Sequence, residues 1–226
     1  MPYALALVAL AVLVAGPALW ARHMLDRYGR DEYFSGTGID LARILVEDLR
    51  LHGVRVETTD RGDHYDPLEK VVRLNPAVAG RRSLTAVVVA AHEIGHAMQD
   101  QSGDGLLRFR TALVRAGIWA ERIGAAGVMV APLLGAALQV PVVGRLLLAA
   151  GACVLGIPVL VHLVTLPVEI DASFSRALPL LRAGRYIPPE DEAAARRILA
   201  ACALTYLAQA LAGMFNVLRW ARIFRR

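Results

Sequence analysis

The chain is built around Leu84-Thr85-Ala86-Val87-Val88-Val89-Ala90-Ala91-His92-Glu93-Ile94-Gly95-His96, an apolar run that ends in two histidines. Ser83 precedes this run and is a good helix cap, so the pattern predicts a helix from Leu84 to about Gln99. Because the residues before the histidines are apolar, we expect the helix to be buried where it approaches them. Residues four apart share one helix face, so the two imidazoles can reach a single metal ion. The stretch therefore predicts a buried and rigidly held metal-binding helix.

The residues from His92 to His96 match the motif H-E-x-x-H. In this motif two helix histidines bind Zn²⁺, and the glutamate acts as the general base of a metallopeptidase. Zinc suits neutral imidazole ligands and lowers the pKa of water to roughly 7. Gly95 has no side chain, which lets another backbone or a substrate come close. We predict His92 and His96 as zinc ligands and Glu93 as the catalytic base; the alternative is a pair of helix histidines that bind no metal.

A catalytic zinc site needs a third protein ligand and one open coordination position. We predict that Glu169 is this ligand. The uncharged runs 123–144 and 146–168, which we predict below to be membrane spans, separate His96 from Glu169. Two spans would bring both residues out on the same side of a membrane. An unpaired carboxylate at the membrane border is unfavourable, and a bound cation would offset that free-energy cost. Pro167 suits the first position of a helix, which would place Glu169 on a first helical turn. The alternative is a carboxylate at the membrane border that binds no metal.

Three polar residues after Glu169 could orient a ligand imidazole or contact the substrate, and the sequence does not choose among them. They are Asp171, Ser173 and Arg176. Two further histidines compete for the place of third ligand. His64 lies in a loop, where a loop-stabilising role is favoured and a substrate contact comes second. His162 lies deep inside a predicted span, where hydrogen bonding between helices is favoured.

Four runs without charged residues divide the rest of the chain, at 3–21, 123–144, 146–168 and 198–218. Each run has close to the ~20 residues that a helix needs to cross a hydrocarbon core of about 30 Å. They predict four transmembrane helices, with buried core helices as the alternative. Residues 22–122 would then form the catalytic domain, and residues 169–197 would form the segment that supplies the third zinc ligand.

Within the catalytic domain, residues 54–58 alternate as a strand does, and residues 68–74 read as a second strand after a turn-rich loop. Together they predict a short β-hairpin. We also expect residues 68–74 to form an edge strand to which an extended peptide could pair. The predicted fold class is a mainly α membrane protein with four transmembrane helices. It also has a small α+β domain that holds the hairpin and the H-E-x-x-H helix.

The chain carries 25 Lys and Arg against 20 Asp and Glu, a net charge of +5. A basic chain can bind nucleic acid, but here the arginines lie mostly beside the apolar runs, which indicates membrane anchoring. The expected partners are a lipid bilayer and a peptide or protein substrate, membrane proteins included, and no nucleic acid. More of the flanking arginines lie on the catalytic side, which predicts a multi-pass protein whose catalytic side is cytoplasmic.

Several motifs resemble those of the YugP-like neutral zinc metallopeptidases of bacterial membranes. They are Asp63 to Pro67, Lys70 to Leu74, Ala90 to Ala97, Leu107 to Arg110 and Leu166 to Glu169. The resemblance extends over nearly the whole chain and implies a zinc peptidase of the bacterial cell membrane with a zincin-like domain. It also implies His92 and His96 as ligands and Glu93 as base. The segment around Glu169 is similar to the downstream ligand of gluzincins, which usually carry an Asp one helical turn later, where this chain has Ser173.

The sequence thus favours a membrane-embedded zinc metalloendopeptidase. The alternative function is a non-catalytic zinc-binding membrane scaffold or assembly factor. Structural zinc sites are closed and seldom place a glutamate beside the first histidine, which favours the enzyme. Cleavage within the membrane is disfavoured, because the apolar stretch before His92 is only about half as long as a membrane span.

Overall fold

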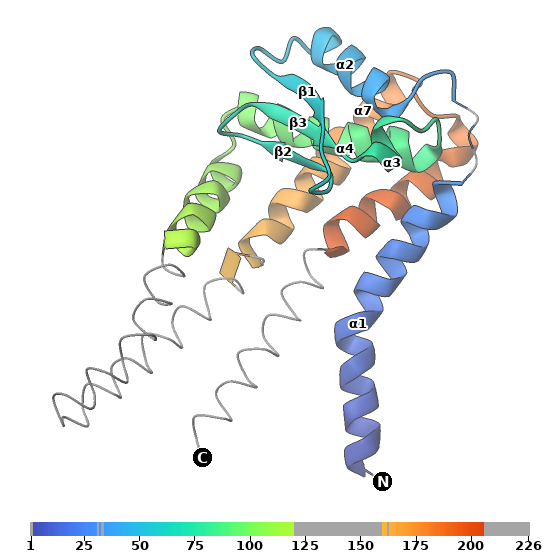
Figure 1. Cartoon of the computed structure of the whole chain (residues 1–226), viewed down its shortest axis with the longest axis vertical. Coiled ribbons are helices and arrows are strands. Elements are labelled where there is room, and N and C mark those ends of the chain that lie inside the picture. The colour runs from blue at the N-terminus through green and yellow to red at the C-terminus, as the bar shows by residue number, and fades with distance from the viewer. Residues whose placement is uncertain (1, 31, 33, 120–159, 162, 206–226) are drawn as a thin grey trace, which may run out of the picture.

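The computed structural model of the chain describes residues 2–30, 32, 34–119, 160–161 and 163–205, with the backbone alone for 2–14. These residues form a mainly helical fold with one small sheet (Figure 1). The helices are α1 (Pro2–Tyr28), α2 (Gly38–Asp48), α3 (Pro76–Ala79), α4 (Leu84–Gln101), the π-helix η1 (Asp171–Ala177), α7 (Leu178–Ala183) and the 3-10 helix η2 (Pro189–Asp191). Residues 105–119, 163–170 and 192–205 are helical as well.

Helix α4 is the central element of the fold. Its cap is Ser83, whose side-chain oxygen accepts a hydrogen bond from the N–H of Ala86 at 3.2 Å. Every residue from Leu84 to Ala97 is buried, so the predicted burial of this helix is confirmed. It packs against α2, α3, the sheet and η1. Because α4 has neighbours on several sides, the side chains that it carries have fixed orientations.

The sheet contains β1 (Arg55–Thr58), β2 (His64–Asp66) and β3 (Val71–Leu74) in the order β1-β3-β2. β1 is parallel to β3, and β2 is antiparallel to it. The predicted hairpin of residues 54–58 with 68–74 is therefore wrong, since the hairpin is formed by β2 and β3. Three of the four residues of β3 are buried, so this apolar strand takes the central position and the more polar strands take the edges.

Strand β3 has neighbours on both sides. Its residue Val72 is aligned with Val56 of β1 and with Tyr65 of β2. A peptide can add only to an unpaired strand edge. The prediction that residues 68–74 form a substrate-binding edge is therefore wrong.

The predicted fold class, a membrane protein with four transmembrane helices, is also wrong for the part of the chain that the structure describes. No helix in that part is both long enough and apolar enough to cross a bilayer. The predicted span 3–21 falls within α1, span 123–144 lies outside the described residues, and spans 146–168 and 198–218 lie partly outside them. Apolar runs do not by themselves distinguish lipid-facing helices from core helices. Val168, Ile198 and Leu199, taken from two predicted spans, are buried in the folded domain.

Candidate metal centre

His92, His96 and Glu169 lie together in the interior of the molecule, and all three side chains are almost fully buried. Glu169 Oε2 is 3.1 Å from His92 Nε2 and 3.2 Å from His96 Nε2. The two imidazole rings meet edge to face, with their centres 4.8 Å apart. The histidines come from α4 and the glutamate from the helical residues 163–170, so two distant segments of the chain build this cluster.

Glu169 stands within a helix and not on its first turn. Residues 163–170 are helical and continue directly into η1. Pro167 therefore lies inside the helical stretch, and the prediction that it begins a new helix is wrong. A proline removes one backbone hydrogen bond, but the packing of η1 against α4 keeps the segment helical.

The charge and surroundings of Glu169 fit a cation site. Burial opposes ionisation of this carboxyl, but the imidazoles of His96 and His92 offset burial and hold its pKa well below the ordinary value. The second oxygen, Oε1, is buried and has no hydrogen-bond partner among the described residues. A buried carboxylate is costly, and a divalent cation bound beside Oε2 would offset the cost. Two imidazoles and a carboxylate are ligands that suit Zn²⁺, so these residues fit a zinc ion.

Ser173 fixes the tautomer of His92. Its Oγ lies 3.1 Å from His92 Nδ1 and donates to the carbonyl of Leu199 at 3.3 Å. Because the hydroxyl proton is used on Leu199, the serine oxygen accepts a hydrogen bond from Nδ1–H. With a metal ion bound at the cluster, the lone pair of His92 Nε2 would then be directed to it. Ser173 thus contacts one of the predicted ligands directly.

Gln99 holds His96 in the same way and is not among the residues predicted from the sequence. Gln99 Oε1 lies 2.9 Å from His96 Nδ1. Its Nε2 donates to the carbonyl of Val168 at 2.9 Å and to Asp171 Oδ2 at 2.8 Å. The amide oxygen can only accept, so His96 donates from Nδ1 and keeps the lone pair of Nε2 for a metal. The signal in the sequence is the spacing, because a polar residue three positions after His96 lies on the same helix face.

Asp171 and Arg176 form an outer layer behind Gln99. Arg176 Nε donates to Asp171 Oδ2 at 2.9 Å, and Arg176 Nη2 lies 4.0 Å from Asp104 Oδ2. Partial burial raises the pKa of Asp171, but the hydrogen bonds from Arg176 and Gln99 outweigh it and lower the pKa overall. Ser173 therefore contacts a histidine of the cluster, Asp171 contacts Gln99, and Arg176 contacts Asp171.

His64 makes its hydrogen bond within its own loop. It begins β2, and its Nδ1–H donates to the carbonyl of Gly62 at 2.8 Å. The neighbouring Asp63 accepts hydrogen bonds from the backbone and the side chain of Asn75. These contacts match the loop-stabilising role that we weighed for His64. His162 lies outside the described residues.

Gly95 lets η1 come close enough to α4 for Glu169 to meet the histidines. A Cβ atom on Gly95 would lie 2.6 Å from the carbonyl oxygen of Ala172, too close for ordinary packing. In the π-helix η1, the N–H of Leu178 donates to the carbonyl of Ser173, five residues earlier. The missing Cβ places the backbones of the two helices in direct contact.

Comparison with known proteins agrees with this geometry. A family model described as "Putative neutral zinc metallopeptidase" matches residues 3–225. The chain belongs to this family. It is also 37% identical over 224 residues to a Bacillus subtilis (strain 168) protein named "Putative membrane protease YugP", with 95% of each chain covered. No solved structure matches the chain. The family resemblance of the sequence motifs is thereby confirmed.

In this member of the zinc metallopeptidase family, Glu93 follows the first histidine of the cluster and is only 5% exposed. Burial raises the pKa of its carboxyl to about 8. A carboxyl with a pKa near neutral pH can take up and return a proton within one reaction cycle. Glu93 is therefore suited to proton transfer beside the cluster.

Proposed function

We propose that the chain is a zinc metalloendopeptidase that hydrolyses peptide bonds. Membership of the family implies a peptide or protein substrate. His92, His96 and Glu169 would hold the zinc ion, and Glu93 would act as the general base. The observation that carries the proposal is the convergence of three buried ligand atoms within 4.8 Å of one another, next to the buried carboxyl of Glu93.

The residues around the cluster have separate roles in this reaction. When bound, Zn²⁺ supplies Lewis acidity, because it lowers the pKa of water to roughly 7 and polarises the substrate carbonyl. The carboxylate of Glu93 accepts a proton from the attacking water and passes it to the leaving amine. Ser173 and Gln99 accept hydrogen bonds from the Nδ1–H groups of the two histidines, so neither imidazole ring turns during the reaction.

The ligand set favours catalysis over a purely structural zinc site. Structural sites are usually closed by four protein ligands, whereas catalytic sites have three and keep one position open. Within the part of the chain that the structure describes, the metal-ligating side chains that converge are His92, His96 and Glu169. We therefore prefer the peptidase to the zinc-binding scaffold.

Removal of metal is expected to abolish hydrolysis of fluorescein-labelled casein by the purified full chain. Treatment with 1,10-phenanthroline should reduce the rate to that of substrate alone, and stoichiometric Zn²⁺ should restore it, because the three ligands need the ion to complete the site. Mg²⁺ is the control ion and should restore nothing, since it requires oxygen ligands. Full activity in a preparation shown by elemental analysis to hold no metal would exclude a zinc peptidase.

We further infer that the protein works at a bacterial cell membrane. The Bacillus subtilis relative is named as a membrane protease. Large apolar side chains are exposed on α1, on the helical residues 105–119 and at residue 160: Leu19, Trp20, Ile118, Trp119 and Leu160. Tryptophan is enriched where proteins meet the membrane–water interface. The inference concerns contact with the bilayer surface; the cytoplasmic position of the catalytic side remains a prediction.

Replacement of both Trp20 and Trp119 by serine should weaken binding to vesicles of phosphatidylethanolamine and phosphatidylglycerol by about tenfold or more. The reason is that burial of one large apolar side chain contributes about 1.5–3 kcal/mol. Vesicle flotation measures the bound fraction. Leu68→Ser is a matched control, because Leu68 is 62% exposed but lies in the turn between β2 and β3. Equal flotation of the double variant and the wild type would contradict this inference.

A further inference from the structure

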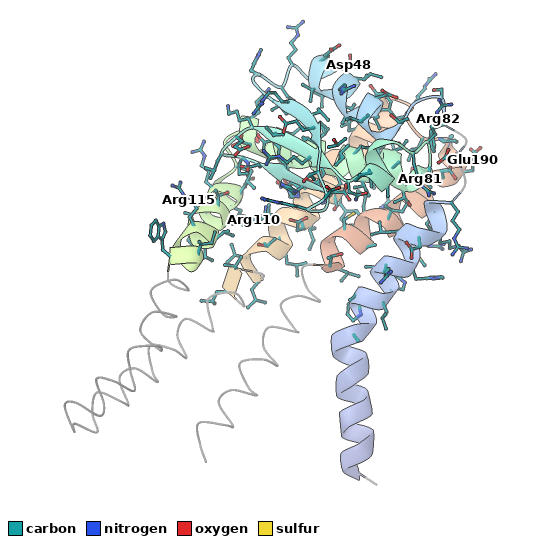
Figure 2. All side chains as sticks on the ribbon, in the orientation of Figure 1. Asp48, Arg81, Arg82, Arg110, Arg115 and Glu190 are labelled. Atoms are coloured by element: carbon teal, nitrogen blue, oxygen red, sulfur yellow. The ribbon has the colours of Figure 1, made fainter. Side chains whose placement is uncertain are left out.

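Arg110 lies on the helical residues 105–119, beside the helix that carries Glu169 (Figure 2). Its Nη2 atom is 3.9 Å from Glu169 Oε1. The other carboxylate oxygen, Oε2, faces His92 Nε2 at 3.1 Å and His96 Nε2 at 3.2 Å. The two oxygens of one carboxylate therefore face different groups, the imidazole pair on one side and the guanidinium on the other.

The start of its helix holds Arg110 in this place. The side chain of Asp104 accepts hydrogen bonds from the backbone N–H groups of Leu106 and Leu107, both at 2.9 Å. Leu107 is 1% exposed and anchors one face of the helix in the protein. Arg110 follows three residues later on the same face, and its side chain is 21% exposed. The guanidinium is thus held against the metal cluster by the fold.

The chemistry of carboxylate ligands gives this contact a role. A carboxylate can bind a metal ion through one oxygen or through both. If Glu169 bound through both, it would use the position that a catalytic zinc keeps open. A guanidinium remains charged at any physiological pH and attracts a carboxylate oxygen. Arg110 therefore draws Oε1 away from the site where His92 and His96 meet Oε2.

We propose that Arg110 is a positioning residue that keeps Glu169 a ligand through one oxygen and thereby preserves an open coordination position. This inference rests on the proposed zinc site. Partners that orient metal ligands typically contribute about 10–100-fold to metal affinity or activity, and we expect Arg110 to contribute within that range.

The test compares Arg110→Met with the wild type in the full chain. Methionine keeps the apolar part of the side chain and removes its charge. The zinc Kd, from competition with a chromophoric chelator, should differ about 10–100-fold from that of the wild type. The visible absorption of the Co²⁺-substituted protein should weaken, because five-coordinate Co²⁺ absorbs less strongly than four-coordinate Co²⁺. Arg115→Met is the matched control, since Arg115 is exposed on the same helix, and it should match the wild type in both measurements.

Two results would overturn the inference. One is a wild-type zinc Kd and Co²⁺ spectrum in Arg110→Met. The other is a fall in kcat while the Kd and the spectrum stay unchanged, since Arg110 would then act on the substrate. If circular dichroism shows that Arg110→Met does not fold, Arg110→Gln is judged by the same measurements. A wild-type chain that binds no zinc would instead refute the proposed function and the inference together.

Discussion

Glu93→Gln is expected to lower the kcat of peptide hydrolysis by about 10²–10⁴-fold and to leave zinc binding intact. Glutamine has nearly the shape of glutamate, but its amide does not serve as a general base near neutral pH. The neighbouring His92 keeps its hydrogen bond to Ser173, so the cluster is not disturbed. The substitution also removes a buried ionisable group, so the Tm should not fall. Hydrolysis rates and elemental analysis of the same preparation measure both effects.

This variant separates the peptidase from a zinc-binding scaffold. Glu190→Gln is the control, because Glu190 is exposed on η2 and carries the same substitution away from the cluster (Figure 2). The control should hydrolyse peptides at the wild-type rate. If Glu93→Gln also did so with its zinc bound, Glu93 would not be the base and the scaffold would become the better interpretation.

Glu169→Ala should weaken zinc binding by more than about 100-fold. Groups that only orient a ligand contribute about 10–100-fold, and the loss of a ligand itself costs more. A ligand at a concentration of 1,000 times its Kd stabilises a folded protein by about 4.1 kcal/mol. Zinc should therefore raise the Tm of the wild type and leave that of the variant unchanged. Chelator competition and thermal unfolding with and without zinc provide the two measurements.

A second substitution at the same position distinguishes lost charge from a lost side chain. Glu169→Gln keeps the volume of this fully buried residue, but its neutral amide oxygen is a weaker ligand. It should bind zinc more weakly than the wild type and melt at a similar temperature in the absence of metal. Tight zinc binding by Glu169→Ala would mean that another residue completes the site.

The parts of the molecule that depend on local sequence could be predicted. Ser83 and the apolar run after it define the start and the burial of α4, because capping and helical periodicity act over a few residues. The spacing of His92 and His96 places both on one face of that helix. The prediction of Glu169 rests instead on the need for a third ligand and on membrane spans that the described helices do not provide.

The parts that depend on contacts between distant segments could not be predicted. The order of the strands depends on which strand is buried against α4, so the parallel pairing of β1 with β3 was missed. Apolar runs were read as membrane helices, although Ile198 and Leu199 lie in the protein core. Gln99 and Arg110 are ordinary polar residues in the sequence and gain their importance only from the side chains that the fold brings beside them.

The distance along the chain between the proposed zinc ligands would affect when the protein can become active during its synthesis. His92 and Glu169 are 77 residues apart. At about 5–20 residues per second, the ribosome adds the glutamate about 4–15 seconds after the first histidine. A nascent or prematurely terminated chain that ends before this glutamate has only two of the three proposed ligands. Newly made copies would thus remain inert towards neighbouring polypeptides until the last segment of the site has been translated and has docked on Gly95.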